Sequence, residues 1–422
     1  MTPETTDILI SGGGIAGLIA AAAFGDAGFS VICVDPLPRA TDATPGATDS
    51  APPATGAKPG GATDLRTTAF LQPAQGLLSA CGLWGRLAPH ATPLRVMRIV
   101  DATDAGAGAG TGTGPKPRLI RDFNSADISD APFGWNLPNR LLRRELVAHL
   151  ATLPGVDFRP GVGIAGVMTR EGQARATLSD GGRVAARLLI GADGRDSPVR
   201  HAAGISVKTT RYGQKALAFA VTHPVPHENV STEIHHRGGP FTLVPLPDHE
   251  GQPCSAVVWM QTGAEALRLS ALPVPDFGAA MTARSCGLLG PLSLITRRTV
   301  WPVISRVAGR MAAERIALMA EAAHVVPPIG AQGLNMSLAD LRVLSELAAR
   351  APADIGSAAM LAAYHRRRHP QVRLRVAGID ALNRVSMAGA RAPRDVRAAA
   401  LAALCSVPPA RRALMRAGLA AR

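Results

Sequence analysis

Three glycines near the amino terminus have the spacing G-x-G-x-x-G, which is typical of a loop that approaches a phosphate group. Gly12 permits a tight turn, Gly14 lets the backbone come close to a pyrophosphate, and Gly17 allows a helix to pack closely on a strand. The backbone N–H groups of Ile15 and Ala16 fall in the first turn of that helix, where they are free to donate to an anion. The motif predicts a dinucleotide-binding loop.

An acidic residue, Asp35, lies 18 residues beyond Gly17, close to the spacing at which a carboxylate hydrogen-bonds a ribose hydroxyl. The segments around the motif have the pattern of a strand over 6–11, an Ala-rich helix over 15–27 and a second strand over 29–34. A carboxylate here favours an unphosphorylated adenosine ribose, as in FAD or NAD. The alternative is a glycine turn with only a structural role, which the strand, helix and acid together make the weaker interpretation.

A second motif runs from Leu188 to Ser197, where a buried strand leads into Asp193 between two glycine-containing turns. Taken without context, these residues predict a strand, a turn and a helix N-cap. The pattern is too common to assign a function to Asp193 by itself.

A third motif combines a short apolar strand, an acid and a turn rich in proline and glycine. Glu321 follows the segment 316–319, and residues 327–335 lead into a helix. The N–H groups at the start of that helix could hold an anion or a carbonyl oxygen. His324 is a candidate general base, but its place beside a turn favours a structural role. The alternative for the whole motif is an ordinary strand–turn–helix connection.

The remaining chain alternates between two kinds of pattern. Strand-like and helix-like segments dominate at first, short alternating runs with Pro- and Gly-rich joints follow, and helical periodicity then returns. We therefore expect an α/β fold in which an antiparallel-sheet domain is inserted into a Rossmann-like domain. The predicted divisions are 1–200 and 306–370 for the nucleotide-binding domain, 201–305 for the sheet domain, 371–422 for a basic helical C-terminal tail, and flexible loops at 41–63 and 102–114.

The net charge of +14 suggests a nucleic-acid partner at first, but its distribution argues against one. Residues 365–422 contain thirteen arginines, two aspartates and no aromatic residue that could stack on a base. A solvated basic face is the favoured interpretation of this segment, and contact with anionic lipid is the alternative.

Cellular context follows from what the sequence lacks. The longest apolar stretch, 15–24, is too short to span a bilayer, and the first residues do not have the pattern of a signal peptide. We therefore expect a cytoplasmic protein. The cysteines are scattered, without a C-x-x-C pair or a His at metal-ligand spacing, which predicts a reducing compartment and no metal site. These cysteines are Cys33, Cys81, Cys254, Cys286 and Cys405.

The order and spacing of the three motifs resemble those of the group A flavoprotein monooxygenases, and the match is nearest to the hydroxylases of ubiquinone biosynthesis. The resemblance extends over nearly the whole chain. Residues 212–216 and 239–246 are similar to stretches typical of the ubiquinone branch. Other segments similar to the family are Asp64-Leu65-Arg66, Leu83-Trp84, Pro138-Asn139-Arg140 with Leu142 and Leu146, and residues 189–195.

The resemblance implies a Rossmann-like FAD-binding domain of the glutathione-reductase type, with residues 201–305 as the substrate-binding sheet. It implies no metal and no named catalytic base. The candidates for contact with the reacting end of the flavin are the turn residues Pro328, Gly330 and Ala331. The residues implied to bind the cofactor are Gly12, Gly14, Ile15, Ala16, Gly17, Asp35, Arg66, Asn139, Asp193, Glu321, Gln332, Gly333, Leu334 and Asn335.

Two departures from the family pattern bear on the flavin geometry. Ala320-Glu321 stands where the family has Gly-Asp, so the carboxylate that would contact the ribityl chain is carried one methylene further from the backbone. The segment 330–333 reads Gly-Ala-Gln-Gly where the family has Ala-Gly-Gln-Gly, which puts a side chain at a position where the family's backbone meets the ring.

By resemblance, NADH or NADPH would reduce FAD, which would react with O₂ to a C4a-hydroperoxide that hydroxylates a phenolic ring. The implied substrate is a polyprenylated ubiquinone precursor. The polyprenyl tail of this substrate implies one of two partners for the protein. The first is the inner face of a bacterial membrane, and the second is a ubiquinone-biosynthesis complex. Two alternatives stay open: an FAD hydroxylase of a soluble aromatic acid, held by Arg211 or Arg237, and a non-catalytic flavin-binding subunit of a biosynthetic complex, which Ala320-Glu321 would fit.

Overall fold

The computed structural model describes residues 2–38, 67–103, 116–387 and 408–419. The loop predicted at 41–63 lies outside the described residues, and so does Arg66. In the loop predicted at 102–114, residues 102 and 103 form the end of a strand, and residues 104–114 lie outside the described residues.

A buried strand, a helix and a second strand open the fold, as the sequence predicts. β1 (Glu4–Ser11) carries Ile8, Leu9 and Ile10, which are all buried, as expected for a parallel strand covered on both faces. The chain continues into α1 (Ile15–Asp26) and returns as β2 (Val31–Asp35), which pairs in parallel with β1.

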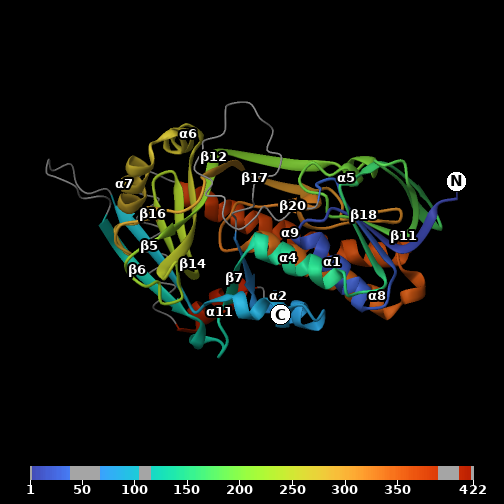
Figure 1. Ribbon diagram of the computed structural model, residues 1–422, viewed down its shortest axis with the longest axis horizontal. Helices are drawn as coiled ribbons and strands as arrows, with labels where there is room; N and C mark the ends of the chain where they lie inside the picture. Colours follow the sequence, from blue (N-terminus) through green and yellow to red (C-terminus); the bar gives the residue numbers. More distant parts are fainter. Residues whose placement is uncertain (1, 39–66, 104–115, 388–407, 420–422) are drawn as a thin grey trace.

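A sheet of eight strands forms the layer that contains β1 and β2 (Figure 1). The strands β2, β1, β11 and β19 run parallel, so their carboxyl ends meet at one edge. A hairpin, which the turn sequence Asp180-Gly181-Gly182 predicts, joins β10 to β11, and β9 pairs with β10. The other strands of this sheet are β8 (Val156–Pro160), β9 (Ile164–Arg170), β10 (Gln173–Leu178), β11 (Arg183–Gly191), β18 (Ala312–Ala313) and β19 (Ile316–Leu318).

A second, mostly antiparallel sheet of nine strands forms the other end of the molecule (Figure 1). It extends beyond the range 201–305, because β5 pairs with β13 and β6 pairs with β5, which covers a strand edge that would otherwise be open. Its strands are β5 (Val96–Thr103), β6 (Lys116–Asn124), β12 (Val207–Thr222), β13 (Val230–His236), β14 (Gly239–His249), β15 (Gln252–Thr262), β16 (Ser293–Leu294), β17 (Thr299–Ala308) and β20 (His324–Val325).

The two faces of strand β12 carry side chains of different size. On β12, Leu217, Phe219 and Val221 pack in one core with residues of α6 (Gly263–Ala271) and α7 (Val274–Arg284). The alternating positions on the same strand point to the opposite face, and three of them are alanines, Ala216, Ala218 and Ala220. The helices therefore cover the face that carries the bulky side chains of β12, and its alanines lie on the other face, where Ala216 packs with Met260 and Val303.

Three short strands connect the two layers. β7 (Gly134–Pro138) lies between β3 (Thr67–Leu71) and β4 (Thr92–Leu94), and Asn136 on β7 donates to the carbonyl of Pro245 on β14 at 2.9 Å. The helices that accompany these strands are α2 (Gln72–Ala80), α3 (Trp84–Leu87) and α4 (Asn139–Leu150), of which α4 packs on α1.

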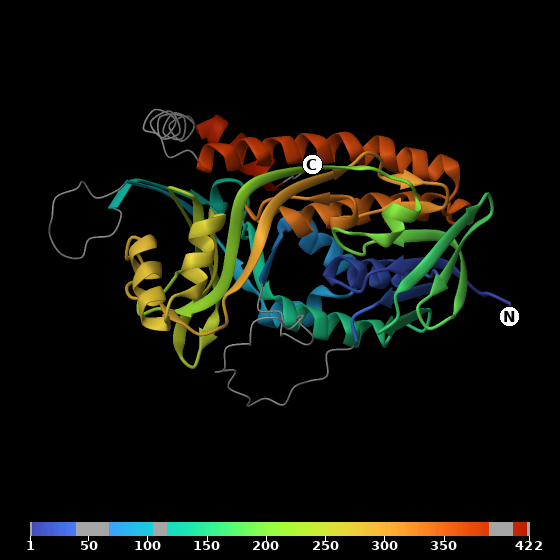
Figure 2. The same cartoon turned by 90° about the horizontal axis from the view of Figure 1, so that it is seen from above.

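Long helices complete the chain, as predicted for its carboxyl-terminal part. They are α8 (Gln332–Arg350), α9 (Ala358–Met387) and α11 (Pro408–Leu419). α9 runs along one edge of the molecule (Figure 2) and continues through Pro370 without a break. Pro370 is exposed, so water can satisfy the carbonyl that the proline leaves without a donor. None of the helices in the described ranges is long and apolar enough to cross a membrane.

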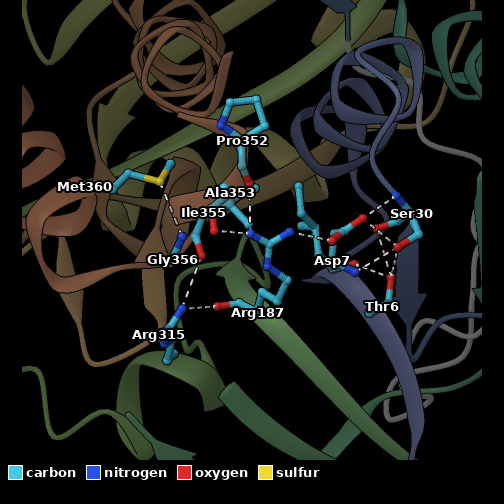
Figure 3. A network of polar contacts seen from close by, with 11 residues as sticks. Thr6, Asp7, Ser30, Arg187, Arg315, Pro352, Ala353, Ile355, Gly356 and Met360 are labelled. Atoms are coloured by element: carbon cyan, nitrogen blue, oxygen red, sulfur yellow. Dashed lines mark hydrogen bonds and ion pairs between the residues drawn. The ribbon is translucent and has the colours of Figure 1, made fainter. Parts of the chain in front are cut away.

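Arg187 on β11 ties the amino-terminal side of the first sheet to the connection between α8 and α9 (Figure 3). Its guanidinium donates to Asp7 on β1 at 2.8 Å and to the carbonyls of Pro352 and Ala353 at 2.8 and 2.6 Å. Partial burial alone would raise the pKa of Asp7, but the bonds from Arg187 and Ser30 hold that pKa below its ordinary value. The network fixes the sheet at the side away from the carboxyl ends of its strands.

Candidate functional site

Among the glycines of the loop after β1, only Gly14 has open space where a Cβ would lie. A Cβ at Gly12, whose φ is +110°, would lie 2.4 Å from the carbonyl oxygen of Ala192. A Cβ at Gly17 would lie 1.8 Å from the carbonyl oxygen of Gly12. Packing therefore requires these two glycines. A Cβ at Gly14 would meet nothing within 4 Å, so a ligand can approach the backbone there.

The open space adjoins the amino terminus of α1. The first bond of the helix runs from the Leu18 N–H to the Gly14 carbonyl at 2.9 Å. The N–H groups of Ile15, Ala16 and Gly17 therefore precede the hydrogen-bonded ladder. Within α1, which the structure describes completely, no acidic side chain occupies the first turn. These donors and the partial positive charge of the helix end fit a diphosphate.

The carboxylate of Asp35 lies buried beneath the loop at the end of β2. It accepts from the Leu37 N–H at 2.9 Å, and a Cβ at Gly13 would come within 2.8 Å of its Oδ2 atom. Arg143 on α4 lies 3.8 Å from Oδ2 and also donates to the Gly13 carbonyl. The sequence analysis missed Arg143, whose only signal is its position one helical turn after Asn139.

Asp193 follows β11 at the same edge of the sheet. One carboxylate oxygen accepts from the Ser11 hydroxyl at 3.2 Å and from the Val199 N–H at 3.1 Å. The other oxygen is buried and has no hydrogen-bond partner among the described residues. Burial raises the pKa of Asp193, although hydrogen bonds from Ser197 and Val199 oppose the shift. An unpaired buried oxygen fits a site whose donor is supplied by a ligand or by water.

The same segment also has the structural role that its pattern predicts. Ser197 is the N-cap of α5 (Pro198–Ala202), and its hydroxyl accepts from the Arg200 N–H at 2.9 Å.

Glu321 lies in the short 3₁₀ turn Ala320–Ala322, directly after β19. Its half-exposed carboxylate is 3.5 Å from Nε of Arg195. The preceding Ala320 has a φ of +56°, in the left-handed region that favours glycine. The alanine that replaces the family's glycine here is therefore expected to cost about 1 kcal/mol of backbone strain.

A buried network of charged side chains holds the 3₁₀ turn Ala320–Ala322 in place. Asp340 on α8 is fully buried and accepts from Nε2 of His324 at 2.7 Å and from Nε of Arg368 on α9 at 2.9 Å. It also accepts from the Ala320 N–H at 3.3 Å. Burial alone would raise the pKa of Asp340, but His324 and Arg368 hold it below its usual value. His324 therefore has a structural role, as the sequence analysis favours, and is not available as a base.

The proline-rich turn before α8 contains two consecutive left-handed residues. Gly330 has a φ of +60° and Ala331 a φ of +56°. Beyond them Gly333 is exposed, and a Cβ there would meet nothing within 4 Å, so the backbone at the start of α8 is open to a ligand. Leu334 packs against the main core, and Pro328 is partly exposed.

Asn335 fastens the turn to the connecting sheet. Its side-chain amide donates to the carbonyls of Ala331 and Ala69 at 2.7 and 2.8 Å, and its carbonyl oxygen accepts from the Leu71 N–H at 2.9 Å. Asn139 is attached to the same strand β3, because the Thr68 hydroxyl donates to its side-chain oxygen at 2.7 Å.

The carboxyl end of α11 meets the same turn, which the sequence analysis did not anticipate. The side chain of Gln332 donates to the Gly418 carbonyl at 3.3 Å and accepts from Arg375 on α9 at 3.1 Å. Met415 and Leu419 are buried in one apolar cluster, which we name the α11 cluster. Its other members are Leu71, Phe123 and Phe133, with Met97, Ile99 and Ile128 packed against them. Part of the basic tail therefore lies at the candidate site.

An apolar wall of the second sheet packs directly against the turn. Ile329 belongs to one buried cluster with Ala216, Met260 and Val303, against which Tyr212, Val258 and Trp301 pack. The Tyr212 hydroxyl lies 2.6 Å from the Ser305 hydroxyl, and burial raises its pKa to about 12. Arg211 and Arg237, the cationic candidates for a soluble acid, are both exposed.

The structure brings most of the predicted residues to one edge of the first sheet. Asp35 is the last residue of β2, and Gly12, Asp193 and Glu321 follow the carboxyl ends of the neighbouring strands β1, β11 and β19. This edge, outside the ends of parallel strands, is where ligands bind in open α/β sheets. The glycine loop can hold a diphosphate, and the turn before α8 joins the site to the apolar wall.

Comparison with known sequences agrees with this arrangement. The profile of the family described as FAD binding domain matches residues 63–377. Ubiquinone hydroxylase UbiL of Rhodospirillum rubrum is 32% identical over 385 residues, which cover 90% of this chain and 82% of that protein. The 3-demethoxyubiquinol 3-hydroxylase of Escherichia coli is 24% identical over 351 residues, covering 82% of this chain and 80% of that protein.

Solved structures share the fold. p-Nitrophenol 4-monooxygenase PnpA from Pseudomonas putida superposes with a TM-score of 0.75 at 18% identity, covering 99% of this chain and 98% of that one. PqsL of Pseudomonas aeruginosa, in complex with 2-aminobenzoylacetate, gives a TM-score of 0.71 at 21% identity, covering 91% and 97%. The predicted fold class and the predicted cofactor are thereby confirmed. The chain belongs to the FAD binding domain family and is an FAD-dependent monooxygenase.

Proposed function

We propose that this protein hydroxylates the aromatic ring of a polyprenylated ubiquinone precursor, with NADH or NADPH as electron donor. The observation that carries the proposal is the apolar wall that packs against the turn before α8. A wall of alanine, valine, methionine and tryptophan suits a prenylated phenol better than a charged ring. The similarity to the ubiquinone hydroxylase of Rhodospirillum rubrum supports the same substrate class.

Each part of the chain has a distinct task in this proposal. The glycine loop and the start of α1 hold the diphosphate, and Asp35 accepts from the adenosine ribose. Asp193 and Glu321 contact the middle of the cofactor, and the open backbone from Gly330 to Gly333 faces the flavin ring. FAD supplies the reduction of O₂ that activates one oxygen atom for transfer.

The protein's contribution to the chemistry is to orient the ring and to exclude water. Apart from the Tyr212 hydroxyl and the Trp301 indole N–H, the side chains of the cluster around Ile329 are apolar. Burial raises the pKa of Tyr212 to about 12, so its hydroxyl stays protonated at neutral pH, where Ser305 and the Asp380 carboxylate on α9 hold it in place. An electron-rich phenol needs no further base for attack on an activated oxygen.

The alternative of a soluble aromatic acid is less well supported. A buried carboxylate needs a cation close by. Both arginines that could serve, Arg211 and Arg237, have exposed side chains. The prenylated substrate instead requires access to lipid, so we propose a peripheral position on the inner face of a bacterial membrane, alone or in a biosynthetic complex.

Purified protein tests the proposal directly. We expect a yellow protein that retains FAD and oxidises NAD(P)H faster when a short-chain prenylphenol is added, with a product one oxygen atom heavier by mass spectrometry. Hydroxylation of a soluble aromatic acid in preference to the prenylphenol would favour the alternative substrate. Bound FAD without turnover of either compound would identify a non-catalytic subunit.

A further inference from the structure

The exposed side of α9 combines apolar side chains with arginines. Leu374 is 77% exposed and Leu382 is 48% exposed. The exposed Ala381 and Leu382 come seven and eight positions after Leu374, about two helical turns, which is the spacing of a stripe along one side of a helix. Since α9 runs along an outer edge of the molecule (Figure 2), its exposed leucines indicate a surface that is covered by something else.

A row of arginines borders the apolar side chains. Arg366 and Arg373 are exposed and seven residues apart, and neither has a carboxylate within ion-pair distance among the described residues. The one acid on the helix, Asp380, is held by Arg384 at 3.2 Å. This face of α9 is therefore positively charged beside its apolar stripe.

A shallow hollow lies where the two rows meet. It has a volume of about 380 Å³ and is lined by His369, Pro370, Arg373 and Leu374. His369 is held in place by stacking on His365 at 4.7 Å and by a contact of 3.1 Å with the Ala308 carbonyl. The hollow combines a fixed imidazole and a guanidinium with an apolar rim, which suits a phosphodiester attached to an acyl chain.

We propose that the face formed by Arg366, His369, Arg373, Leu374 and Leu382 binds the surface of a membrane that contains anionic phospholipid. The arginines contact headgroups, and Leu374 and Leu382 enter the boundary of the acyl layer, as in a helix that lies in the plane of the interface. This inference rests on the proposed function, since a prenylated substrate resides in such a membrane. It assigns the contact to α9, whereas the sequence analysis had considered the basic tail as a whole.

Sedimentation of the full-length, FAD-loaded protein with vesicles tests the proposal. We expect binding to phosphatidylcholine vesicles that contain phosphatidylglycerol and little binding to phosphatidylcholine alone. Each arginine near an anionic surface contributes roughly fivefold to the binding constant. The double variant Arg366→Glu/Arg373→Glu should therefore bind at least about 25-fold more weakly, and Leu374→Glu about tenfold more weakly.

Matched control variants carry the same chemical changes elsewhere. Leu267→Glu alters a leucine on α6 that is 51% exposed, and Arg170→Glu alters an exposed arginine on β9. Both should bind vesicles within about twofold of the unmodified protein. Equal loss of binding in variants and controls would overturn the proposal, and so would vesicle binding that Leu374→Glu leaves unchanged.

Two further measurements separate other occupants of the face. Inorganic phosphate added at constant ionic strength should leave vesicle binding unchanged, and its abolition of binding would instead identify a site for free phosphate. Light scattering should give the same mass for Leu374→Glu as for the unmodified protein. A lower mass, without loss of vesicle binding, would make this face a contact between copies of the chain and overturn the proposal.

Failure of the membrane proposal can be distinguished from failure of the proposed hydroxylation. All these variants lie away from the candidate site, so each should retain FAD and turn over a short-chain prenylphenol at the unmodified rate. A protein that hydroxylates the prenylphenol but ignores vesicles overturns the membrane inference alone. A protein that binds vesicles through α9 but carries no flavin overturns the proposed function alone.

Discussion

The glycine loop after β1 and the turn before α8 are built in different ways, although both are expected to touch one cofactor. In the loop, a glycine occupies each position where a Cβ would meet backbone at close range, as at Gly12 and Gly17. In the turn, a left-handed position is occupied by alanine, at Ala331, and another alanine, Ala320, has a similar conformation nearby. The loop adopts its shape without strain, whereas the turn must be held in place.

The holding contacts come from distant parts of the chain. Asn335 ties Ala331 to strand β3, and Asp340 binds the N–H of Ala320 while joining His324 to Arg368. The two regions are therefore positioned by different means. Local stereochemistry positions the loop, and contacts with distant residues hold the turn in its strained conformation.

Removal of the buried carboxylate should have the largest effect. Asp340→Ala leaves the Arg368 guanidinium and His324 buried without their partner, so we expect a loss of roughly 3–5 kcal/mol in the free energy of unfolding. Urea denaturation at neutral pH measures this loss. Asp354→Ala, which alters an exposed carboxylate, should change stability by less than about 0.5 kcal/mol. A small effect of Asp340→Ala would mean that the turn does not depend on the network.

The difference in stability between the unmodified protein and Asp340→Ala should depend on pH. The pKa of Asp340 is lower in the folded protein than its ordinary value of 3.8, so its stabilising effect is present above pH 3.8 and is lost as the pH falls through the folded pKa. Asp340→Ala lacks this contribution at every pH. The stabilities of the two proteins should therefore converge only below pH 3.8.

Gly17→Ala should have the next largest effect. The added Cβ would lie 1.8 Å from the Gly12 carbonyl oxygen, which is backbone and cannot give way, so we expect a loss of about 3 kcal/mol or more and no bound FAD. Absorbance of the purified protein and denaturation measure both. Gly14→Ala is the control, because its Cβ meets nothing. It should fold normally and only weaken FAD binding, and normal FAD content in Gly17→Ala would contradict the role given to the loop.

Loosening the turn should have an intermediate effect. Asn335→Ala removes two donated bonds and leaves the Leu71 N–H without its acceptor, at a cost of about 2 kcal/mol. Since a mobile turn admits water, more of the NAD(P)H oxidised should end as hydrogen peroxide, which a peroxidase assay measures. Gln75→Ala, which removes a partly exposed amide on α2 that bonds only to Ser79 among the hydrogen bonds of the described residues, should leave peroxide production unchanged. Equal peroxide yields for the two variants would show that Asn335 does not restrain the turn.

The smallest effect is expected at the left-handed alanine. Ala331→Gly relieves strain but increases the freedom of the unfolded chain, so stability should rise by no more than about 1 kcal/mol. Gly330→Ala, at a φ of +60°, should lower stability by a similar amount. Thermal denaturation resolves the two directions. A loss of stability in Ala331→Gly would indicate that the methyl group makes a contact of its own.

The parts of the fold that the sequence predicts well are those governed by local constraints. The strand, loop, helix and strand from Glu4 to Asp35 depend on glycines and on runs of apolar residues that few conformations can satisfy. The β10–β11 hairpin follows from its Asp180-Gly181-Gly182 turn in the same way. The structural role of His324 could also be predicted from the sequence, because a histidine beside a turn is usually hydrogen-bonded within the fold.

Other features have no local signal. Arg143 and Arg368 sit on helices with ordinary polar patterns, and nothing in their neighbours indicates that they reach Asp35 and Asp340. Pairing of β5 with β13 joins segments more than a hundred residues apart, so the sheet domain could not be delimited from composition. The α11 cluster likewise depends on where the end of the chain returns.

The sequence by itself therefore determined the nucleotide-binding loop, the class of fold and the order of its elements, because steric limits on glycine and the periodicity of apolar residues act over a few neighbouring residues. Only the tertiary structure decided which charges face one another beneath Glu321, that α11 contacts Gln332, and that the outer face of α9 carries leucines beside arginines. Those features arise from contacts between residues far apart in the chain, and burial and pairing exist only once these segments have come together.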